Sequence, residues 1–123
     1  PYSGVITKFV SRLKAGRPPV IEGDGKQTRD FIHARDVVEM LVLVLNKKGV
    51  NGEVFNCGSG VSTSILELAN RAIAVSGHRL KPEFTSPRVG DIRDSLSDNT
   101  KAWKLLGFRP KISLDDGLAE LFR

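Results

Sequence analysis

The chain has 123 residues, 40% of them hydrophobic, which fits one globular domain with a modest core. Its longest apolar stretch, residues 37–45, is interrupted by Glu39 and is too short to cross a bilayer. No signal-peptide pattern follows Pro1, so we expect a cytoplasmic protein without a membrane partner. The single cysteine, Cys57, excludes an internal disulfide and a cysteine-based metal site.

Nineteen Lys and Arg residues against fourteen Asp and Glu residues give the chain a net charge of +5. This charge favours an anionic partner but leaves nucleic acid, acidic lipid and a diphosphate ligand open. The basic residues are scattered through periodic segments such as 8–17, which favours a solvated face over a nucleic-acid-binding stripe. The chain starts at Pro1 without an initiating Met, and we interpret it as a fragment.

The first third of the chain predicts one helix and two short strands. Apolar residues at positions 5, 6, 9, 10 and 13 lie on one face of a helix that ends near Gly16. Residues 19–21 and 28–34 predict two strands, joined by the Gly-Asp-Gly turn at 23–25.

The next segment predicts a helix over residues 37–46, with Asp36 as its N-cap. This helix is apolar on nearly every side, so it must be buried on more than one face. The remaining elements are predicted as a strand at 53–57 with a glycine turn at 58–60, a helix at 64–77 capped by Ser64 and Glu67, a strand at 82–86, a helix at 98–107 capped by Asp98, and a last helix capped by Ser113 and Asp116.

The pattern therefore predicts an α/β fold of about five helices and four short strands. These strands are too few and too broken to close a parallel sheet on their own. The helix at residues 37–46 and the strand at residues 53–57 require a partner layer that the chain does not contain.

The sequence offers no complete catalytic or metal-binding set, so we expect no catalytic and no metal-ligating residue. No glycine-rich loop opens a helix after an N-terminal strand, and His33 and His78 are the only histidines available for a triad. The turn at 58–60 follows a strand, but it lacks a third glycine and a ribose-binding acid downstream. A structural turn explains it better than a phosphate loop.

Two charge-rich turns, residues 23–31 and 87–93, each place arginine beside carboxylate. The planar guanidinium suits bidentate contact with phosphate oxygens, so Arg29 and Arg88 could clamp a diphosphate from separate loops. A nearby Asp could accept the hydroxyls of a ribose. Considered alone, either pair is better explained as a salt bridge that holds a loop.

Residues 23–33, Gly-Asp-Gly-Lys-Gln-Thr-Arg-Asp-Phe-Ile-His, followed by Asp-Val-Val at 36–38, closely resemble a signature of one enzyme family. The signature belongs to the C-terminal half of UDP-glucose 4-epimerases and related NAD-dependent nucleotide-sugar epimerases and dehydratases, which are extended short-chain dehydrogenases. The resemblance covers essentially all 123 residues and includes the segments 1–6, 54–60, 88–91, 98–110 and 113–117. It implies that residues 1–123 are the C-terminal, nucleotide-sugar-binding portion of an extended Rossmann-type enzyme.

The resemblance implies a set of residues that contact a UDP-sugar. Arg29 and Arg88 would contact the diphosphate, and Asp91 would hold the ribose. Four apolar residues would lie near the nucleotide, although a core position explains each of them equally well: Val20, Ile65, Val5 and Ile6. Val20 would also offer backbone hydrogen bonds to the uracil.

Three further positions are interpreted by comparison with the same family. Glu22 departs from the family pattern, because many relatives carry an aromatic residue there. Asp30 and His33 are interpreted as structural residues that orient the strand behind Arg29.

The resemblance also implies an NAD cofactor, bound by a portion upstream of residue 1 together with a Tyr-x-x-x-Lys catalytic pair. Tyr2 has no Lys four residues later and is not that tyrosine. We therefore expect the fragment alone to be catalytically inert, and the full-length protein to be a homodimer.

An epimerase is favoured over the other members of the family. Residues 28–31, Thr-Arg-Asp-Phe, resemble epimerases more than UDP-glucuronate decarboxylases, and residues 2–6 resemble epimerases more than dTDP-glucose 4,6-dehydratases. A dehydratase or a decarboxylase remains the alternative. A stand-alone basic domain that binds nucleic acid is a further alternative, but scattered charge and the absence of aromatic stacking platforms argue against it.

Overall fold

The computed structural model describes residues 4–123, so Tyr2 and the start of the segment 1–6 lie outside the described residues. In this part of the chain the elements number five helices and four short strands, which confirms the predicted fold class. In chain order they are α1 (Val5–Lys14), β1 (Val20–Glu22), β2 (Thr28–Arg29), α2 (Ala34–Asn46), β3 (Thr63–Ser64), α3 (Ile65–Ser76), β4 (Glu83–Thr85), α4 (Thr100–Leu106) and α5 (Leu114–Leu121).

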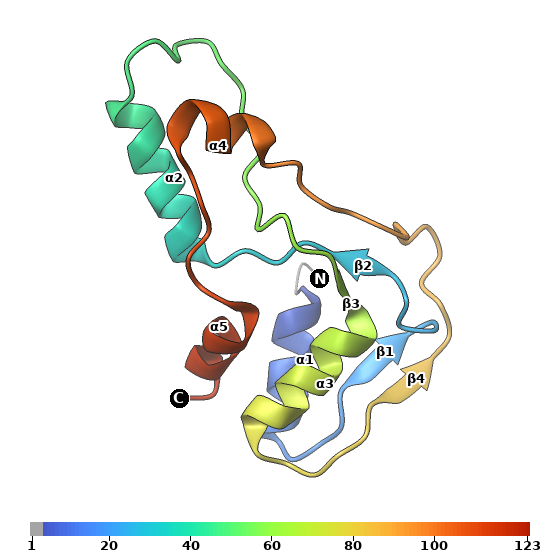
Figure 1. The fold of residues 1–123 in the computed structure, drawn as a ribbon. Coiled ribbons are helices and arrows are strands. Elements are labelled where there is room, and N and C mark those ends of the chain that lie inside the picture. The colour runs from blue at the N-terminus through green and yellow to red at the C-terminus, as the bar shows by residue number, and fades with distance from the viewer. Residues whose placement is uncertain (1–3) are drawn as a thin grey trace.

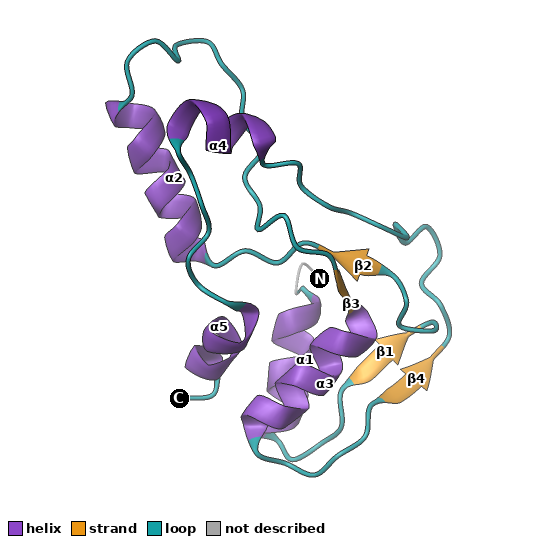
Figure 2. Cartoon of the chain, in the orientation of Figure 1, coloured by secondary structure: helices purple, strands orange, loops and turns teal. Residues whose placement is uncertain are grey.

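The strands form two separate pairs rather than one sheet (Figure 2). β1 pairs in parallel with β4, with Ile21 opposite Phe84, and β2 pairs antiparallel with β3, with Thr28 opposite Ser64. β1 and β2 are joined by the predicted glycine turn, but each takes its partner from the second half of the chain. The sheet is incomplete because its four strands form two separate two-stranded ladders.

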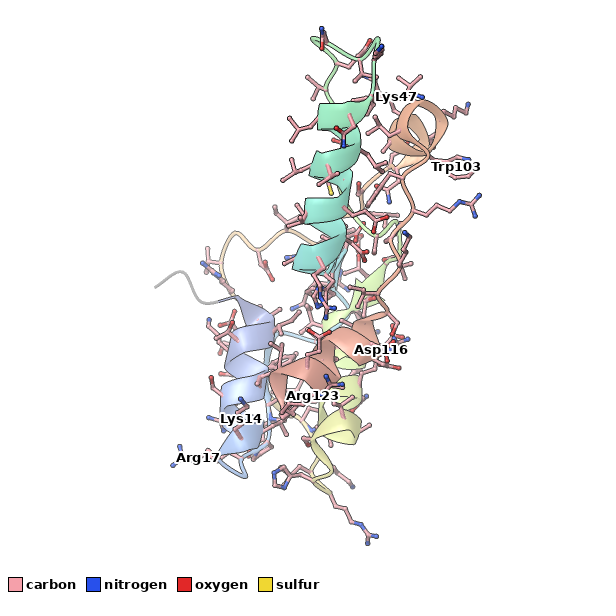
Figure 3. The ribbon with its side chains drawn as sticks, turned by 90° about the vertical axis from the view of Figure 1, so that its left-hand side faces the viewer. Lys14, Arg17, Lys47, Trp103, Asp116 and Arg123 are labelled. Atoms are coloured by element: carbon pink, nitrogen blue, oxygen red, sulfur yellow. The ribbon has the colours of Figure 1, made fainter. Side chains whose placement is uncertain are left out.

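Two hydrophobic clusters lie at opposite ends of the molecule (Figures 1 and 3). The larger cluster joins α1, α3, α5 and β1, and its fully buried side chains include Phe9, Leu68 and Leu118. The smaller cluster lies between α2 and α4, around Met40 and Phe108. Extended segments connect the two clusters, and the second pair of strands lies along this connection (Figure 1).

Local signals placed most helix ends correctly. The Ser64 hydroxyl accepts the backbone N–H of Glu67 at 3.0 Å, and the Ser113 hydroxyl accepts that of Asp116 at 3.1 Å. Each bond satisfies one of the free N–H groups in the first turn of a helix. Gly77 ends α3 with a φ of 78° in the left-handed region, which a residue without a Cβ adopts at no steric cost.

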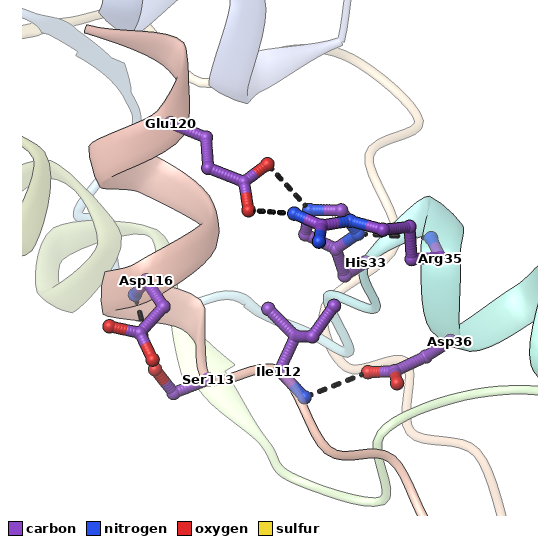
Figure 4. A network of polar contacts seen from close by, with 7 residues as sticks. All are labelled: His33, Arg35, Asp36, Ile112, Ser113, Asp116 and Glu120. Atoms are coloured by element: carbon purple, nitrogen blue, oxygen red, sulfur yellow. Dashed lines mark hydrogen bonds and ion pairs between the residues drawn. The ribbon is translucent and has the colours of Figure 1, made fainter. Parts of the chain in front are cut away.

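The predicted N-cap at Asp36 was wrong. α2 begins at Ala34, three residues earlier than predicted, and His33 caps it by accepting the backbone N–H of Arg35 at 3.0 Å. Asp36 is almost fully buried and accepts the backbone N–H groups of Lys111 and Ile112, both at 3.1 Å. Figure 4 shows the bond with Ile112. The carboxylate therefore binds α2 to the segment before α5, a contact that no local pattern encodes.

Two further caps differ in detail from the prediction. The Glu67 side chain pairs with Arg71 at 2.8 Å instead of reaching back to the cap, so only the serine half of the capping box forms. Asp98 lies one residue before the N-cap of α4, and its carboxylate accepts the backbone N–H of Thr100 at 2.9 Å.

The predicted strand at 53–57 does not form, and the strand predicted at 28–34 is confined to Thr28–Arg29. A strand needs a neighbouring strand for its backbone groups, and the described residues place none beside the segment 53–57. Val54 is 78% exposed in this segment. The predicted short strand at 82–86 forms as β4.

α2 exposes much of its apolar surface, against the prediction that it is buried on more than one face. Only Asp36 and Met40 are buried along the helix, and Leu45 is 84% exposed. The smaller cluster covers one side of α2 only. No helix within residues 4–123 has the length and apolar character needed to span a membrane.

Candidate functional site

A hollow of about 480 Å³ lies between the start of α1, β1 and the loop that follows β4. All seven residues predicted to contact a ligand line this hollow, although they come from five separate segments of the chain: Val5, Ile6, Val20, Arg29, Ile65, Arg88 and Asp91. The structure thus brings the whole predicted set to one place.

The apolar wall of the hollow comes from three elements. Val5 and Ile6 lie in the first turn of α1, and Ile65, only 5% exposed, opens α3. Alternation along β1 sends Ile21 into the core and leaves Val20 facing the hollow. These side chains offer an apolar surface suited to the flat face of a ring.

The polar wall is dominated by an ion pair between Arg29 and Asp91. Their side-chain atoms approach to 2.7 Å and are 25% and 33% exposed. The Arg29 guanidinium also donates to the carbonyl oxygens of Thr28, at 2.6 Å, and Arg93, at 3.4 Å. These contacts hold Arg29 in one orientation at the wall of the hollow.

Arg88 lines the same hollow from the loop after β4 and is exposed. It forms no ion pair with a carboxylate of residues 4–123. Two guanidinium groups from separate loops thus reach one cavity, an arrangement that suits an anion with several oxygens.

The two charge-rich turns pair with each other rather than within themselves. Arg29 of the first turn pairs with Asp91 of the second, and Arg93 of the second pairs with Asp24 of the first, at 3.1 Å. The hydrogen bond from Arg93 is the largest cause that holds the pKa of Asp24 below its ordinary value. The salt bridges expected to hold single loops instead join two loops.

Asp30 lies next to Arg29 in the chain and has a structural role, as predicted. Its carboxylate accepts the Ser59 N–H at 2.7 Å, the Ser59 hydroxyl at 2.5 Å, the Gly60 N–H at 2.9 Å and the Ser97 N–H at 3.1 Å. Partial burial raises the pKa of Asp30, but these hydrogen bonds outweigh it and hold the pKa below its ordinary value. The glycine turn at 58–60 therefore binds an internal carboxylate, which supports its interpretation as a structural turn.

Gly58 is required by the close approach of this turn to its neighbours. A Cβ placed there would lie 2.3 Å from the Cβ of Ser97 and 2.8 Å from a carboxylate oxygen of Asp30. Both distances are far below van der Waals contact, so a larger residue would displace the segment that Asp30 holds.

His33 has structural contacts, but they lie at the junction of α2 and α5 and not at the strand behind Arg29, where it was predicted to act (Figure 4). Its Nε2 lies 3.0 Å from a carboxylate oxygen of Glu120, which also pairs with Arg35. The hydrogen bond to His33 is the main cause that holds the pKa of Glu120 below its ordinary value. This network lies outside the hollow and fixes the end of the chain to the N-terminus of α2.

A family model for GDP-mannose 4,6 dehydratases matches residues 2–121, nearly the whole chain. The chain belongs to this family. Within it, a UDP-glucose 4-epimerase from Mycolicibacterium smegmatis is 42% identical over 124 residues, which cover 98% of this chain and 39% of the relative. The family also includes relatives described as dTDP-D-glucose 4,6-dehydratase and UDP-N-acetyl-alpha-D-glucosaminuronate decarboxylase, at 35% and 32% identity.

Solved structures of family members have the same fold. A UDP-glucose 4-epimerase from Thermotoga maritima with UDP-glucose superposes with a TM-score of 0.91 at 36% identity, covering 99% of this chain and 39% of that structure. A UDP-glucuronic acid 4-epimerase from Bacillus cereus, in complex with UDP-glucuronic acid and NAD, gives a TM-score of 0.87 at 32% identity, covering 97% and 38%. The chain thus spans about 39% of the length of its relatives and matches their C-terminal part, which confirms the resemblance.

Further residues outside the predicted set line the hollow of this family member, among them Lys8 and Gln27. Lys8 lies one helical turn beyond Val5 and faces the hollow, a position that helical spacing could have revealed. Gln27 lies within the quoted signature, is only 8% exposed, and donates to the backbone carbonyl of Glu22 at 2.9 Å. Its burial depends on tertiary contacts and leaves no local signal.

Proposed function

We propose that this chain is the nucleotide-sugar-binding part of an NAD-dependent epimerase that acts on a UDP-sugar. In this proposal Arg29 and Arg88 hold the diphosphate, Asp91 accepts hydroxyl groups of the ribose, and the uracil lies against Val20. The observation that carries the proposal is the convergence of these residues on one hollow, with apolar and charged walls on different elements.

The electrostatics of the hollow support a diphosphate ligand. Charge-assisted hydrogen bonds from arginine to phosphate each contribute roughly 1.5–3 kcal/mol in a partly desolvated site. Because Asp91 already orients Arg29 at 2.7 Å, less side-chain entropy is lost when the ligand binds. Arg88 has no carboxylate partner within residues 4–123 and is available to the ligand.

The apolar wall supports the position of the base and of the sugar. Val5, Ile6, Val20 and Ile65 line the hollow together, so a ring bound there would lie against hydrophobic side chains. Firm anchoring of the nucleotide leaves the sugar as the mobile part of the ligand, which suits a reaction that requires the sugar to turn over within the site.

The described residues do not fit NAD. The glycine turn at 58–60 directs its N–H groups to the carboxylate of Asp30, so they are not presented to a phosphate. We infer that the cofactor and the catalytic residues belong to a further part of the whole protein, and that the chain alone is inert. A titration of this chain with NAD, expected to give no binding, tests the inference, and tight binding would contradict it.

The same further part would cover the surfaces of this chain that lack a partner. The apolar face of α2, with Leu41 58% and Leu45 84% exposed, and the extended segment around Val54 are the surfaces that require cover. In the whole protein, backbone N–H groups of residues 53–57 should exchange with solvent more slowly than in the isolated chain, because pairing protects them. We also propose that the whole protein is a homodimer, which analytical ultracentrifugation would test.

Epimerase activity is favoured over the other activities in the family. The 42% identical relative and the structure with a TM-score of 0.91 are both UDP-glucose 4-epimerases. A dehydratase is the second candidate, since a relative at 35% identity is described as one. Incubation of the whole protein with UDP-glucose separates them, because an epimer keeps the mass of the substrate whereas dehydration lowers it by one water.

Nucleic-acid binding is not favoured by the distribution of basic side chains. Lys14 and Arg17 lie at one end of the molecule and Lys47 at the other (Figure 3). Arg29 and Arg93 are engaged by carboxylates. Affinity for an oligonucleotide that falls steeply with salt would contradict this view.

The proposal is tested by calorimetric titration of the whole protein with UDP. Arg29→Ala and Arg88→Ala should each weaken binding about tenfold or more, from the loss of charge-assisted bonds. Arg79→Ala is the matched control, because Arg79 is exposed and does not line the hollow. Unchanged affinity in both site variants would refute the proposed diphosphate clamp.

A further inference from the structure

The two loops that carry the charged residues of the hollow meet at Arg93, which contacts the first loop in two ways. Its backbone carbonyl accepts the Thr28 N–H at 2.8 Å and the Arg29 guanidinium at 3.4 Å. Its side chain reaches in another direction and donates to both carboxylate oxygens of Asp24, at 3.1 and 3.3 Å. Arg93 thus spans the first loop from Asp24 to Arg29.

Asp24, which accepts these bonds from Arg93, is itself held in a fixed position. Its carboxylate also accepts the backbone N–H of Lys26 at 2.8 Å, which closes a local turn. The turn is fixed on both sides. On one side the Gly23 N–H donates to the Thr85 carbonyl at 3.0 Å. On the other side Gly25, at a φ of 76°, packs so closely on α3 that an added Cβ would lie 3.0 Å from the Cβ of Leu66. The position of Asp24 is therefore set by β4 and α3.

Apart from Arg93, the second loop is fixed at its end by Thr28, whose carbonyl accepts the Ser95 N–H at 3.2 Å and whose hydroxyl donates to Asp94 at 2.8 Å. Fewer contacts hold the loop before this point. Val89 is 99% exposed and Ile92 is 64% exposed, so no hydrophobic packing holds the loop in place. The Asp91 side chain faces Arg29 and the hollow, whereas Arg93, two residues later, pairs with Asp24. Polar contacts alone define where Arg88 and Asp91 lie.

The stability of the fold does not account for the ion pair between Asp24 and Arg93. The two side chains are 51% and 58% exposed, and an exposed ion pair contributes little to the free energy of unfolding. Two parallel hydrogen bonds to one carboxylate nevertheless fix distance and orientation. Such a pair is suited to set the position of a loop rather than to hold the fold together.

We propose that Asp24 and Arg93 are positioning residues, whose ion pair sets the second loop so that Asp91 and Arg88 face Arg29 before the ligand enters. The inference rests on the proposed function, since it concerns the same hollow. Neither residue contacts the ligand in this account. Their effect on affinity is exerted through the residues that do.

A double-mutant cycle in the whole protein, with UDP as the probe, tests this inference. Asp24→Asn keeps an oxygen that can accept the Lys26 N–H but removes the charge, and Arg93→Ala removes the partner. Each should weaken UDP binding about three- to tenfold, while the double variant should lose no more than either single variant. The thermal midpoint should stay close to that of the unmodified protein. Arg71→Ala removes the distant ion pairs with Glu67 and Asp115 and serves as the control.

The outcomes separate this inference from the proposed function. Weakened binding in Arg29→Ala, with unchanged binding in Asp24→Asn and Arg93→Ala, would overturn the positioning role and leave the diphosphate clamp in place. Losses that multiply in the double variant would also overturn it, because Asp24 and Arg93 would then act independently. No UDP binding by the unmodified protein would refute the proposed function, and the inference with it.

Discussion

Replacement of Asp30, a half-buried carboxylate, by Asn should destabilise the protein more than the same change at an exposed Asp. Asp30 joins three segments, because its two oxygens accept four hydrogen bonds from Ser59, Gly60 and Ser97. An amide keeps one acceptor oxygen and turns an NH₂ group toward N–H donors. At least two of the four bonds are therefore lost, and the donors face a repulsive partner.

The magnitude follows from the charge and the burial of the site. Hydrogen bonds to a charged group contribute about 1.5–3 kcal/mol each when buried, and partial exposure to solvent lowers this value. We expect a total loss of about 2–3 kcal/mol in the free energy of unfolding, and a fall of about 8–12 °C in the thermal midpoint for a chain of this size. Asp98→Asn is the control, since Asp98 is exposed and bonds only to Thr100.

The effect should depend on pH in a defined direction. Because the pKa of Asp30 in the folded protein is below its ordinary value, the carboxylate stabilises the fold at every pH above about 4. This stabilisation is lost as the pH falls through the lower pKa of the folded state. The difference between the unmodified protein and Asp30→Asn should therefore be full at pH 7 and shrink below about pH 4.

Urea unfolding, followed by circular dichroism at pH 7 and at about pH 3, measures both expectations. A loss below about 0.5 kcal/mol at pH 7 would refute the view of Asp30 as the residue that joins the three segments. A difference of equal size at both pH values would refute the assignment of the effect to the charged carboxylate.

Two further variants test neighbouring parts of the account. Gly58→Ala should cost about 2–4 kcal/mol, because its Cβ would lie 2.3 Å from that of Ser97; urea unfolding measures this, and a neutral variant would contradict the close approach. Ser64→Ala should cost about 1 kcal/mol through the lost N-cap of α3, and Ser62→Ala, at an exposed position before β3, should change the midpoint little.

The parts of the fold that were predictable are those encoded by neighbouring residues. The caps at Ser64 and Ser113 and the end of α3 at Gly77 depend on groups within one helical turn, and all three were correct. The segment 53–57 has the pattern of a strand but no partner among the described residues, so its conformation could not follow from its own sequence. Asp36 stands in a typical cap position, but its carboxylate accepts hydrogen bonds from the segment before α5, which lies 75 residues away in the sequence.

In the site, too, some features were predictable from the sequence and others depend on contacts between distant segments. Arg29, Arg88 and Asp91 were identified through a family resemblance, and the structure brings them to one hollow. Their pairing could not be read from the chain, because each charge-rich turn has an Arg and an Asp of its own. The choice of Arg29 for Asp91 and of Arg93 for Asp24 is set by the backbone contacts between Thr28 and the second loop, which bring two distant segments into register.

The most direct test of the central claim is the affinity of the whole protein for UDP, measured by calorimetry for the unmodified form and for Arg29→Ala. The account predicts saturable binding by the unmodified protein, an affinity weakened about tenfold or more in the variant, and no change in Arg79→Ala. No binding of UDP, or equal affinity in all three proteins, would contradict the claim that this hollow holds the diphosphate of a nucleotide sugar.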